Sequence, residues 1–264
     1  MRGMKKRPYR QLAVGIAILA STNLVTASDE WEFALSPLFL WGMSIKGDAT
    51  IGGVTAPLDL TFKDDILENM EAVLTVHFEA RKGIWTFFTE LQYVDLEPTV
   101  EVEIGPIDVK GDISFENTMF ELGAAYALSE SDSTRWELIG GGRYTDQEVG
   151  VDVTIPTPMP PPLDEVNIDK KGGDDWWHAF LGARVSHSFN DKWSFIGRTD
   201  LGYGGSDNKA INASFQFDYR FRDWGSAFAG YRYLQYDYDN DSSSDGYAFD
   251  AYQQGPLLGL TIYW

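Results

Sequence analysis

The chain lacks two features, and each absence limits its fold and chemistry. It contains no cysteine, which excludes disulfides, thiolate nucleophiles and cysteine-ligated metal sites. A chain without thiols also avoids mispaired bridges in an oxidising compartment. Between residues 28 and 264 there is no run of 18 consecutive apolar residues, so no transmembrane helix is predicted. If this chain spans a membrane, a closed β-barrel is the remaining way to satisfy its backbone groups in lipid.

Positive charge is also scarce. The chain has 21 lysines and arginines against 40 aspartates and glutamates, for a net charge of −19. Such a chain repels the phosphates of DNA and RNA, so no nucleic-acid partner is predicted. Acid-rich loops that face water are a plausible use of the excess charge.

The first 27 residues have the composition of a secretory signal peptide. Residues 2–10 carry five basic side chains and no acid, and an apolar run follows at 11–20. This run is too short to cross a bilayer as a helix. Small or apolar residues then precede the predicted cleavage after Ala27. The predicted organisation is a signal peptide at 1–27, removed on export, and a single barrel domain at 28–264.

From Trp31 onward the apolar residues recur with a period of two. A soluble sandwich also alternates, but many segments of about ten residues, each with an apolar face, are typical of outer-membrane barrels. We therefore predict an all-β fold, a transmembrane antiparallel up-and-down β-barrel. The strand count is about ten, and the alternation leaves it open by two. The predicted strands lie near residues 31–46, 71–81, 84–97, 112–128, 135–150, 175–189, 193–204, 209–221, 225–238 and 252–264.

The connections between these strands alternate in length. This is the asymmetry of short periplasmic turns and long extracellular loops. Within the long connections, the hairpin-like segments at 48–62 and 98–111 are predicted to be strand extensions outside the bilayer. The long connections cover residues 47–70, 98–111, 151–174 and 239–251.

Two of the long connections contain distinctive segments. Residues 155–163 hold five prolines, which favour a stiff, extended segment without ladder hydrogen bonds. We predict a rigid surface loop, with a recognition loop for a partner as the alternative. Residues 63–70 have the pattern of a short helix capped by Asp64 or Asp65. This helix would either enter the barrel mouth or cover its rim.

The last ten residues, GPLLGLTIYW, alternate with one wholly apolar face and end on an aromatic residue. Such a segment resembles the closing strand of bacterial outer-membrane barrels, which the barrel-assembly machinery recognises. Leu260, Ile262 and Trp264 are the predicted assembly signal. Tryptophans near strand ends would set the depth of the barrel in lipid; they are Trp85, Trp136, Trp176, Trp177, Trp193 and Trp224.

If the apolar face of each strand meets lipid, the opposite face lines the interior. That face is rich in charge, and buried charges need partners or water. Glutamates gather on the first half of the wall and arginines on the second. Two alternatives follow: ion pairs that fill a closed interior, or a narrow wet channel that selects small polar solutes. The predicted lumen charges are Glu79, Glu90, Glu121, Glu137, Arg143, Arg184, Arg198, Asp200, Asp218, Arg220 and Arg232, with His77, Gln92 and Gln216 on the same faces.

The chain has three histidines, and a lipid hydrolase would need one of them beside a serine nucleophile. His187 lies between two serines, but adjacent strand residues point to opposite faces. His178 is predicted to be an interfacial side chain near the outer rim. His77 shares its face with Glu79, and no serine is evidently placed beside them. We therefore predict no catalytic residue, and an enzyme acting on outer-membrane lipid is the least favoured alternative.

The acidic run at 236–246 contains part of a calcium-binding pattern. Asp237, Asp239 and Asp241 match the first three ligand positions of an EF-hand. Ser242 replaces the required glycine and Ala248 the final glutamate, so the EF-hand is excluded. No metal site and no other cofactor is predicted. Loose binding of divalent cations that bridge lipopolysaccharide stays open as an alternative.

Four segments, residues 77–85, 206–224, 230–238 and 255–260, resemble a family of uncharacterised, porin-like outer-membrane β-barrel proteins of Gram-negative bacteria. The resemblance implies a bacterial outer-membrane location and contact with its lipid and lipopolysaccharide. It carries over no catalytic residue and no oligomeric state. The expected function is a narrow pore for small polar solutes, with a closed structural or surface-interaction barrel as the alternative.

Overall fold

The computed structural model describes residues 30–37, 39–63, 70–97, 99–104, 107–156, 165–240 and 246–264. The expected signal peptide, nearly all of the helix expected at 63–70 and most of the proline-rich stretch lie outside the described residues. The longer elements of the described chain are all β-strands. No helix in these ranges has the length and apolar character needed to cross a membrane.

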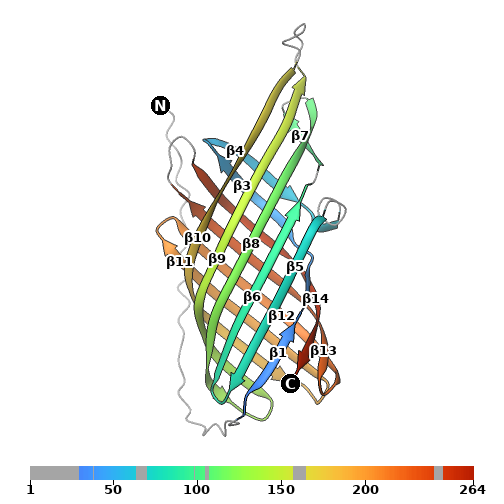
Figure 1. Cartoon of the computed structure of the whole chain (residues 1–264), viewed down its shortest axis with the longest axis vertical. Helices are drawn as coiled ribbons and strands as arrows, with labels where there is room; N and C mark the ends of the chain where they lie inside the picture. Colours follow the sequence, from blue (N-terminus) through green and yellow to red (C-terminus); the bar gives the residue numbers. More distant parts are fainter. Residues whose placement is uncertain are drawn as a thin grey trace.

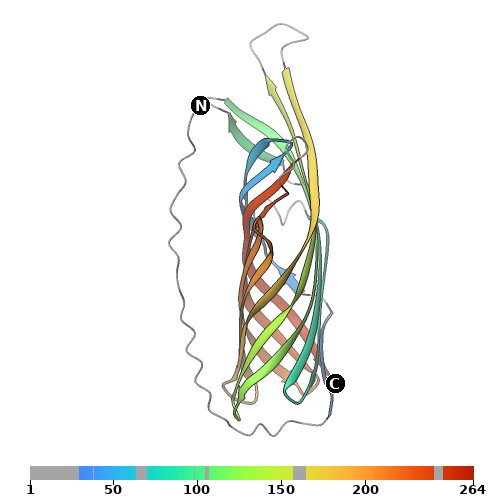
Figure 2. The same ribbon diagram turned by 90° about the vertical axis from the view of Figure 1, so that its left-hand side faces the viewer.

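Ten antiparallel strand positions close into one long barrel (Figures 1 and 2). The first position is broken into three segments that pair in turn with the last strand, and its first segment also pairs with β5, which closes the ring. These segments are β1 (Glu32–Ser36), β2 (Phe39–Trp41) and β3 (Ser44–Ile51). The other nine strands are β5 (Met70–Lys82), β6 (Trp85–Leu96), β8 (Ile107–Glu130), β9 (Thr134–Pro156), β10 (Glu165–Ser188), β11 (Trp193–Gly205), β12 (Asn208–Arg222), β13 (Gly225–Asp239) and β14 (Tyr247–Tyr263).

The predicted up-and-down barrel of about ten strands is confirmed. Two short strands, β4 (Val54–Leu60) and β7 (Thr99–Ile104), form hairpins with β3 and β8, as expected for strand extensions. The prediction of a long loop at 151–174 is wrong, because β9 and β10 stay paired as far as Pro156 and Glu165. In the sequence, valine and isoleucine recur at every second position on both sides of the prolines, which continues the strand pattern.

The breaks in the first strand position have local causes. Pro37 has no N–H to donate to a ladder. At the second break, the Gly42 N–H donates to the Pro256 carbonyl at 2.7 Å. The backbones are so close here that a Cβ on Gly255 would lie 1.8 Å from the Gly42 carbonyl oxygen. Glycine at position 255 therefore permits this contact, and the strand resumes beyond it as β3.

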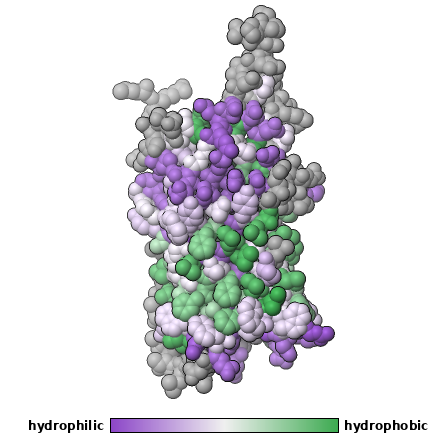
Figure 3. All heavy atoms as spheres, in the orientation of Figure 1, coloured by the Kyte–Doolittle hydropathy of each residue, from purple (hydrophilic) through white to green (hydrophobic). Residues whose placement is uncertain are grey.

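The faces of the long strands change character halfway along their length. On β8 the inward residue Phe115 is followed by the inward Glu121, while the outward Glu116 is followed by the outward Leu122 and Leu128. The lower half of the barrel is therefore apolar outside and charged inside, and the upper half is the reverse. Figure 3 shows this as a green band in the lower half beneath a purple upper half.

The apolar belt occupies only part of the strand length. Strands β8, β9 and β10 have 23 or 24 residues, about twice the 9–11 that cross a bilayer. Their upper halves project beyond the belt, and the β9–β10 hairpin reaches farthest (Figure 1). The tryptophans expected to face outward do so, with one exception: Trp85, Trp136, Trp177, Trp193 and Trp224 are exposed.

Trp176 is the exception, because it points inward. Only 4% of its surface is exposed, and its ring stacks on Tyr238 with the ring centroids 4.1 Å apart. Neighbouring strand residues alternate between faces, so Trp176 and Trp177 cannot both meet lipid. The prediction of an interfacial role for Trp176 is wrong for this reason.

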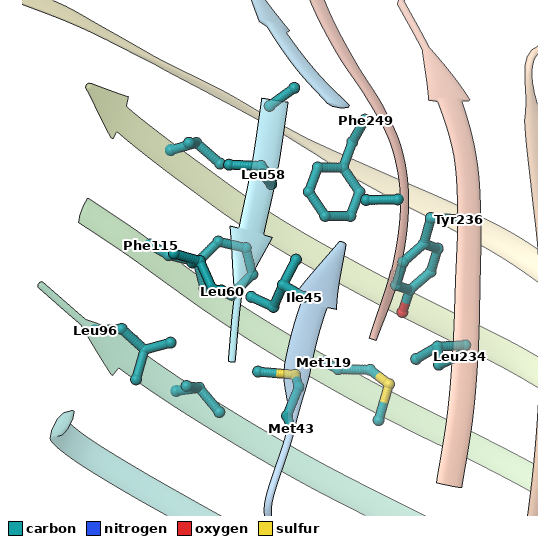
Figure 4. Close-up of a cluster of buried hydrophobic side chains, with 14 of the residues drawn as sticks. Met43, Ile45, Leu58, Leu60, Leu96, Phe115, Met119, Leu234, Tyr236 and Phe249 are labelled. Atoms are coloured by element: carbon teal, nitrogen blue, oxygen red, sulfur yellow. The ribbon is translucent and has the colours of Figure 1, made fainter. Parts of the chain in front are cut away.

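A hydrophobic core fills the upper interior. The β3–β4 hairpin contributes Ile45, Leu58 and Leu60, which are almost fully buried. Figure 4 shows these side chains near Phe115 of the facing strand β8 and Phe249 of the neighbouring strand β14. The rings of these two phenylalanines lie 6.4 Å apart. Side chains from opposite sides of the barrel thus meet above the apolar belt.

Candidate functional site: a charged chamber inside the barrel

Below this core, the interior holds a network of ion pairs. At its centre Arg143 is fully buried, and its Nη2 atom donates to Glu121 at 2.7 Å and to Asp200 at 2.9 Å. Arg198 bonds the same two carboxylates, with 2.7 Å to Glu121 and 2.8 Å to Asp200. Two arginines and two acids from β8, β9 and β11 thereby neutralise one another.

A second group of charges lies nearer the lower end. Arg184 on β10 donates to Glu137 at 2.6 Å and to Glu79 on β5 at 2.5 Å. Arg135 joins the same Glu137 at 2.9 Å. His77 is 3.1 Å from Glu79, so this group continues into the side chains of β5.

A third pair spans the barrel between β13 and β6. Arg232 donates to Glu90 at 2.5 Å, and the other ring nitrogen of His77 lies 3.1 Å from the same glutamate. His77 therefore joins the second and third groups. Glutamates of the first half of the wall and arginines of the second half are in direct contact. Ion pairs therefore join the two halves of the wall at these positions.

Two aromatic rings in the network were not predicted from the sequence. Phe88 and Phe180 point inward, and the guanidinium of Arg198 lies 5.2 Å from each ring centroid. Glycines make room for them: a Cβ on Gly123 would lie 2.4 Å from the Phe88 ring, and one on Gly141 would lie 2.8 Å from that of Phe180. The alternation of strand residues between faces could have predicted this, because Phe88 lies two positions from Glu90 and therefore on the same face.

Two of the predicted lumen charges lie outside the ion-pair network. Asp218 is buried, and it accepts hydrogen bonds from Gln216 Nε2 at 2.9 Å and Ser226 Oγ at 3.2 Å. Arg220 is exposed at the lower mouth, with its guanidinium 4.3 Å from the Tyr263 ring centroid. Both face inward as predicted, but neither forms an ion pair with another described residue.

The other two histidines contact an arginine and a threonine. His178 is buried, and its Nε2 accepts from Arg143 at 3.3 Å, so its prediction as an interfacial side chain is wrong for the same alternation reason as Trp176. His187 Nδ1 is 2.7 Å from the Thr134 hydroxyl. Across the described ranges no serine hydroxyl is hydrogen-bonded to a histidine, and no cluster of His, Asp or Glu could hold a metal. Residues 241–245 of the acidic run lie outside those ranges.

The space left by these side chains forms two adjoining cavities. The inner cavity, of about 180 Å³, is lined by charged and apolar residues of the network region, including Asp218 and Phe228. The outer cavity, of about 430 Å³, lies at the lower mouth among the short turns. They share Ala34 and Tyr263 among their lining residues. The chamber therefore approaches solvent from the lower end of the barrel.

Polar contacts also join strands at the top of the barrel. Tyr238 and Asn240 donate to the same carboxylate oxygen of Asp174, at 2.8 and 2.7 Å. Partial burial and this hydrogen bond raise the pKa of Tyr238 above its usual range. The phenol therefore stays protonated and remains a donor at neutral pH, which ties β13 to β10 beyond the belt.

Comparison with known proteins identifies the fold. No protein-family model and no curated protein matches the chain. Among solved structures, outer membrane protease OmpT from Escherichia coli matches with a TM-score of 0.56 and 10% identity, covering 92% of this chain and all of that one. OprG and a FadL homologue, both from Pseudomonas aeruginosa, match with TM-scores of 0.34 at 12% and 10% identity. They cover 91% and 89% of this chain, and 99% and 90% of their own. The chain has the fold of an outer-membrane β-barrel protein.

Proposed function

We propose that the chain is an integral protein of the bacterial outer membrane with a closed, non-conducting interior, and that its contacts with partners are made by the hairpins above the belt. One observation carries this proposal: the hydrophobic core around Leu58 and Phe115 is packed directly above the ion-pair network. A solute that crossed the barrel would have to pass both the hydrophobic core and the ion-pair network. The narrow pore, which was the function expected from the sequence, has less support because its charged walls are in contact.

The apolar belt and the fold support the outer-membrane location. Exposed side chains such as Leu122, Leu181 and Leu201 would be costly in water and favourable in lipid. Export by a cleaved signal at 1–27 belongs to this proposal. So do contact with outer-membrane lipid and lipopolysaccharide, and insertion by the barrel-assembly machinery.

We also propose that the barrel has no enzymatic role. All three histidines are engaged by charged or hydroxyl side chains, and His77 is held between two carboxylates. A base engaged in this way has no adjacent serine to activate. The protease among the structural neighbours shares the fold, and a fold alone does not carry a catalytic function across.

A closed interior predicts that the barrel conducts no ions. The refolded protein, shown to be folded by its heat-modifiable migration, should give no discrete conductance steps in planar lipid bilayers. A general porin in the same bilayers is the positive control. Reproducible steps would contradict the closed barrel. A change of ion selectivity in Arg198→Ala or Arg232→Ala would then assign the current to this lumen.

The closing seam predicts a role for Trp264 in assembly, together with Leu260 and Ile262 of the proposed signal. The Trp264 ring stacks on Phe33 with centroids 5.6 Å apart, and the backbones of these two residues exchange hydrogen bonds of 3.0 and 3.2 Å. Trp264→Ala removes the ring contact where β1 meets β14. We expect severalfold less heat-modifiable barrel in the outer-membrane fraction, measured by immunoblotting. Trp193→Ala, which removes an exposed tryptophan at the start of β11, away from the β1–β14 contact, is the control, and equal losses in both variants would contradict a seam-specific role.

A further inference from the structure

Asp218 differs from the other buried acids of the barrel. Five carboxylates are buried in the described part of the chain, and four of them pair with an arginine. Asp218 has no cationic side chain within ion-pair distance there; its hydrogen-bond donors are the neutral groups of Gln216 and Ser226. Arg220 interacts with Asp218 electrostatically without forming an ion pair. A buried carboxylate without a paired cation is costly, so this position favours the arrival of a cation.

The carboxylate faces the inner cavity beside an apolar surface. Phe228 lies directly opposite Asp218 in the β12–β13 register, on the same inward face. Its ring is 6.5 Å from that of Phe39, and Leu257 lines the same cavity. One end of the cavity thus offers negative charge next to aromatic and aliphatic side chains.

The cavity size limits what can bind. A volume of about 180 Å³ is slightly larger than the roughly 150 Å³ of an engineered protein cavity that takes up benzene. The lining shared with the mouth cavity at Ala34 and Tyr263 gives access from the lower end. The three arginines that line the cavity, Arg184, Arg198 and Arg232, already bind carboxylates, so an anionic ligand finds no free arginine there.

We propose that this chamber is a binding site for a small organic amine, with the ammonium on Asp218 and an apolar body of about one ring against Phe228. The ligand enters from the lower, turn-bearing end, which faces the periplasm in the proposed orientation. A charge-assisted hydrogen bond to the carboxylate gives the specificity, and burial of the apolar body adds affinity. This inference goes beyond the closed barrel, since a ligand can enter the chamber without crossing the upper core.

Benzylamine is the probe, and benzyl alcohol is its neutral counterpart of nearly the same shape. Isothermal titration of the refolded protein in zwitterionic micelles, with protein-free micelles as the blank, should show saturable binding of benzylamine at one site. Benzyl alcohol should bind at least tenfold more weakly. Equal binding of the two, or no saturable benzylamine binding, would overturn the proposal.

The variant Asp218→Asn keeps the shape of the side chain and one of its two acceptor oxygens but removes the charge. We expect at least a tenfold loss of benzylamine affinity and no change for benzyl alcohol. Asp237→Asn, which removes an exposed carboxylate at the far end of β13, is the matched control and should leave both affinities unchanged. Retained benzylamine affinity in Asp218→Asn would overturn the assignment. If that variant does not fold, the comparison of the two probes on the unaltered protein still decides.

Discussion

Replacing Arg143 by methionine should lower the free energy of unfolding by about 3–5 kcal/mol, the usual cost of removing one partner from a buried ion pair. The side chain is completely buried, and it bonds both Glu121 and Asp200. Without it, Arg198 alone must compensate two buried carboxylates. Methionine fills much of the same volume, so the loss reports the charge and its hydrogen bonds more than a cavity.

Urea titration in micelles, followed by tryptophan fluorescence, measures this change. Lys171→Ala is the matched control, because it also removes one cation from an ion pair, that with Glu148 at 2.7 Å, but on the exposed surface. Exposed pairs contribute little, so this variant should unfold at nearly the same urea concentration as the unaltered protein. If the two variants were equally stable, the network would not be a structural element of the barrel.

The fold was predictable because alternation and repetition are properties of local sequence. Ten segments with an apolar face point to ten strands, and the observed strands include every one of them. The proline-rich stretch misled the prediction at 151–174. The five prolines led to the prediction of a loop despite the alternating valines before them, although the β9–β10 hydrogen-bonded ladder runs to Pro156. Composition indicated a loop where the strand pattern had not yet ended.

The upper core was missed because one assumption was applied along whole strands. The inward positions were taken as polar throughout, yet on β8 they run from Ile113 and Phe115 through Met119 to Glu121. The sequence shows that the apolar residues move from one face to the other when the alternation is followed beyond the apolar belt. In the proposed membrane location, outward positions meet lipid below and water above, so the apolar residues change sides.

The partners within the network could not be predicted from the sequence. Strand alternation identifies Glu90 and Arg232 as inward residues. They are separated by 142 positions in the sequence and meet only across the closed barrel. Whether such walls meet or enclose water depends on the barrel's cross-section and on side chains such as Phe88 that occupy the space between. The sequence therefore left both alternatives open, and the three-dimensional structure favours the closed one.

Replacing Leu58 by aspartate should release the β3–β4 hairpin from the upper core while the belt below stays intact. Leu58 is about 1% exposed among apolar side chains. The substitution removes a contribution of about 2–5 kcal/mol and adds a carboxylate without a partner. β4 is an edge strand that pairs with β3 alone, whereas β3 is also paired with β14, so exposure of the β3 backbone requires the hairpin to open from both neighbours.

Trypsin cleavage after Lys46 on β3 measures the release. In the intact protein Lys46 lies in a strand paired on both sides and bonded to Asp59 at 2.8 Å, and a protease needs this backbone to open first. We expect cleavage at least tenfold faster in Leu58→Asp. Val54→Asp, which places the same charge on the same strand at a position 47% exposed, should be cleaved at the original rate. Because the belt and the ion pairs around Arg143 do not involve this hairpin, both variants should keep heat-modifiable migration. Loss of migration in Leu58→Asp alone would instead show that the two halves of the barrel fold as one cooperative unit.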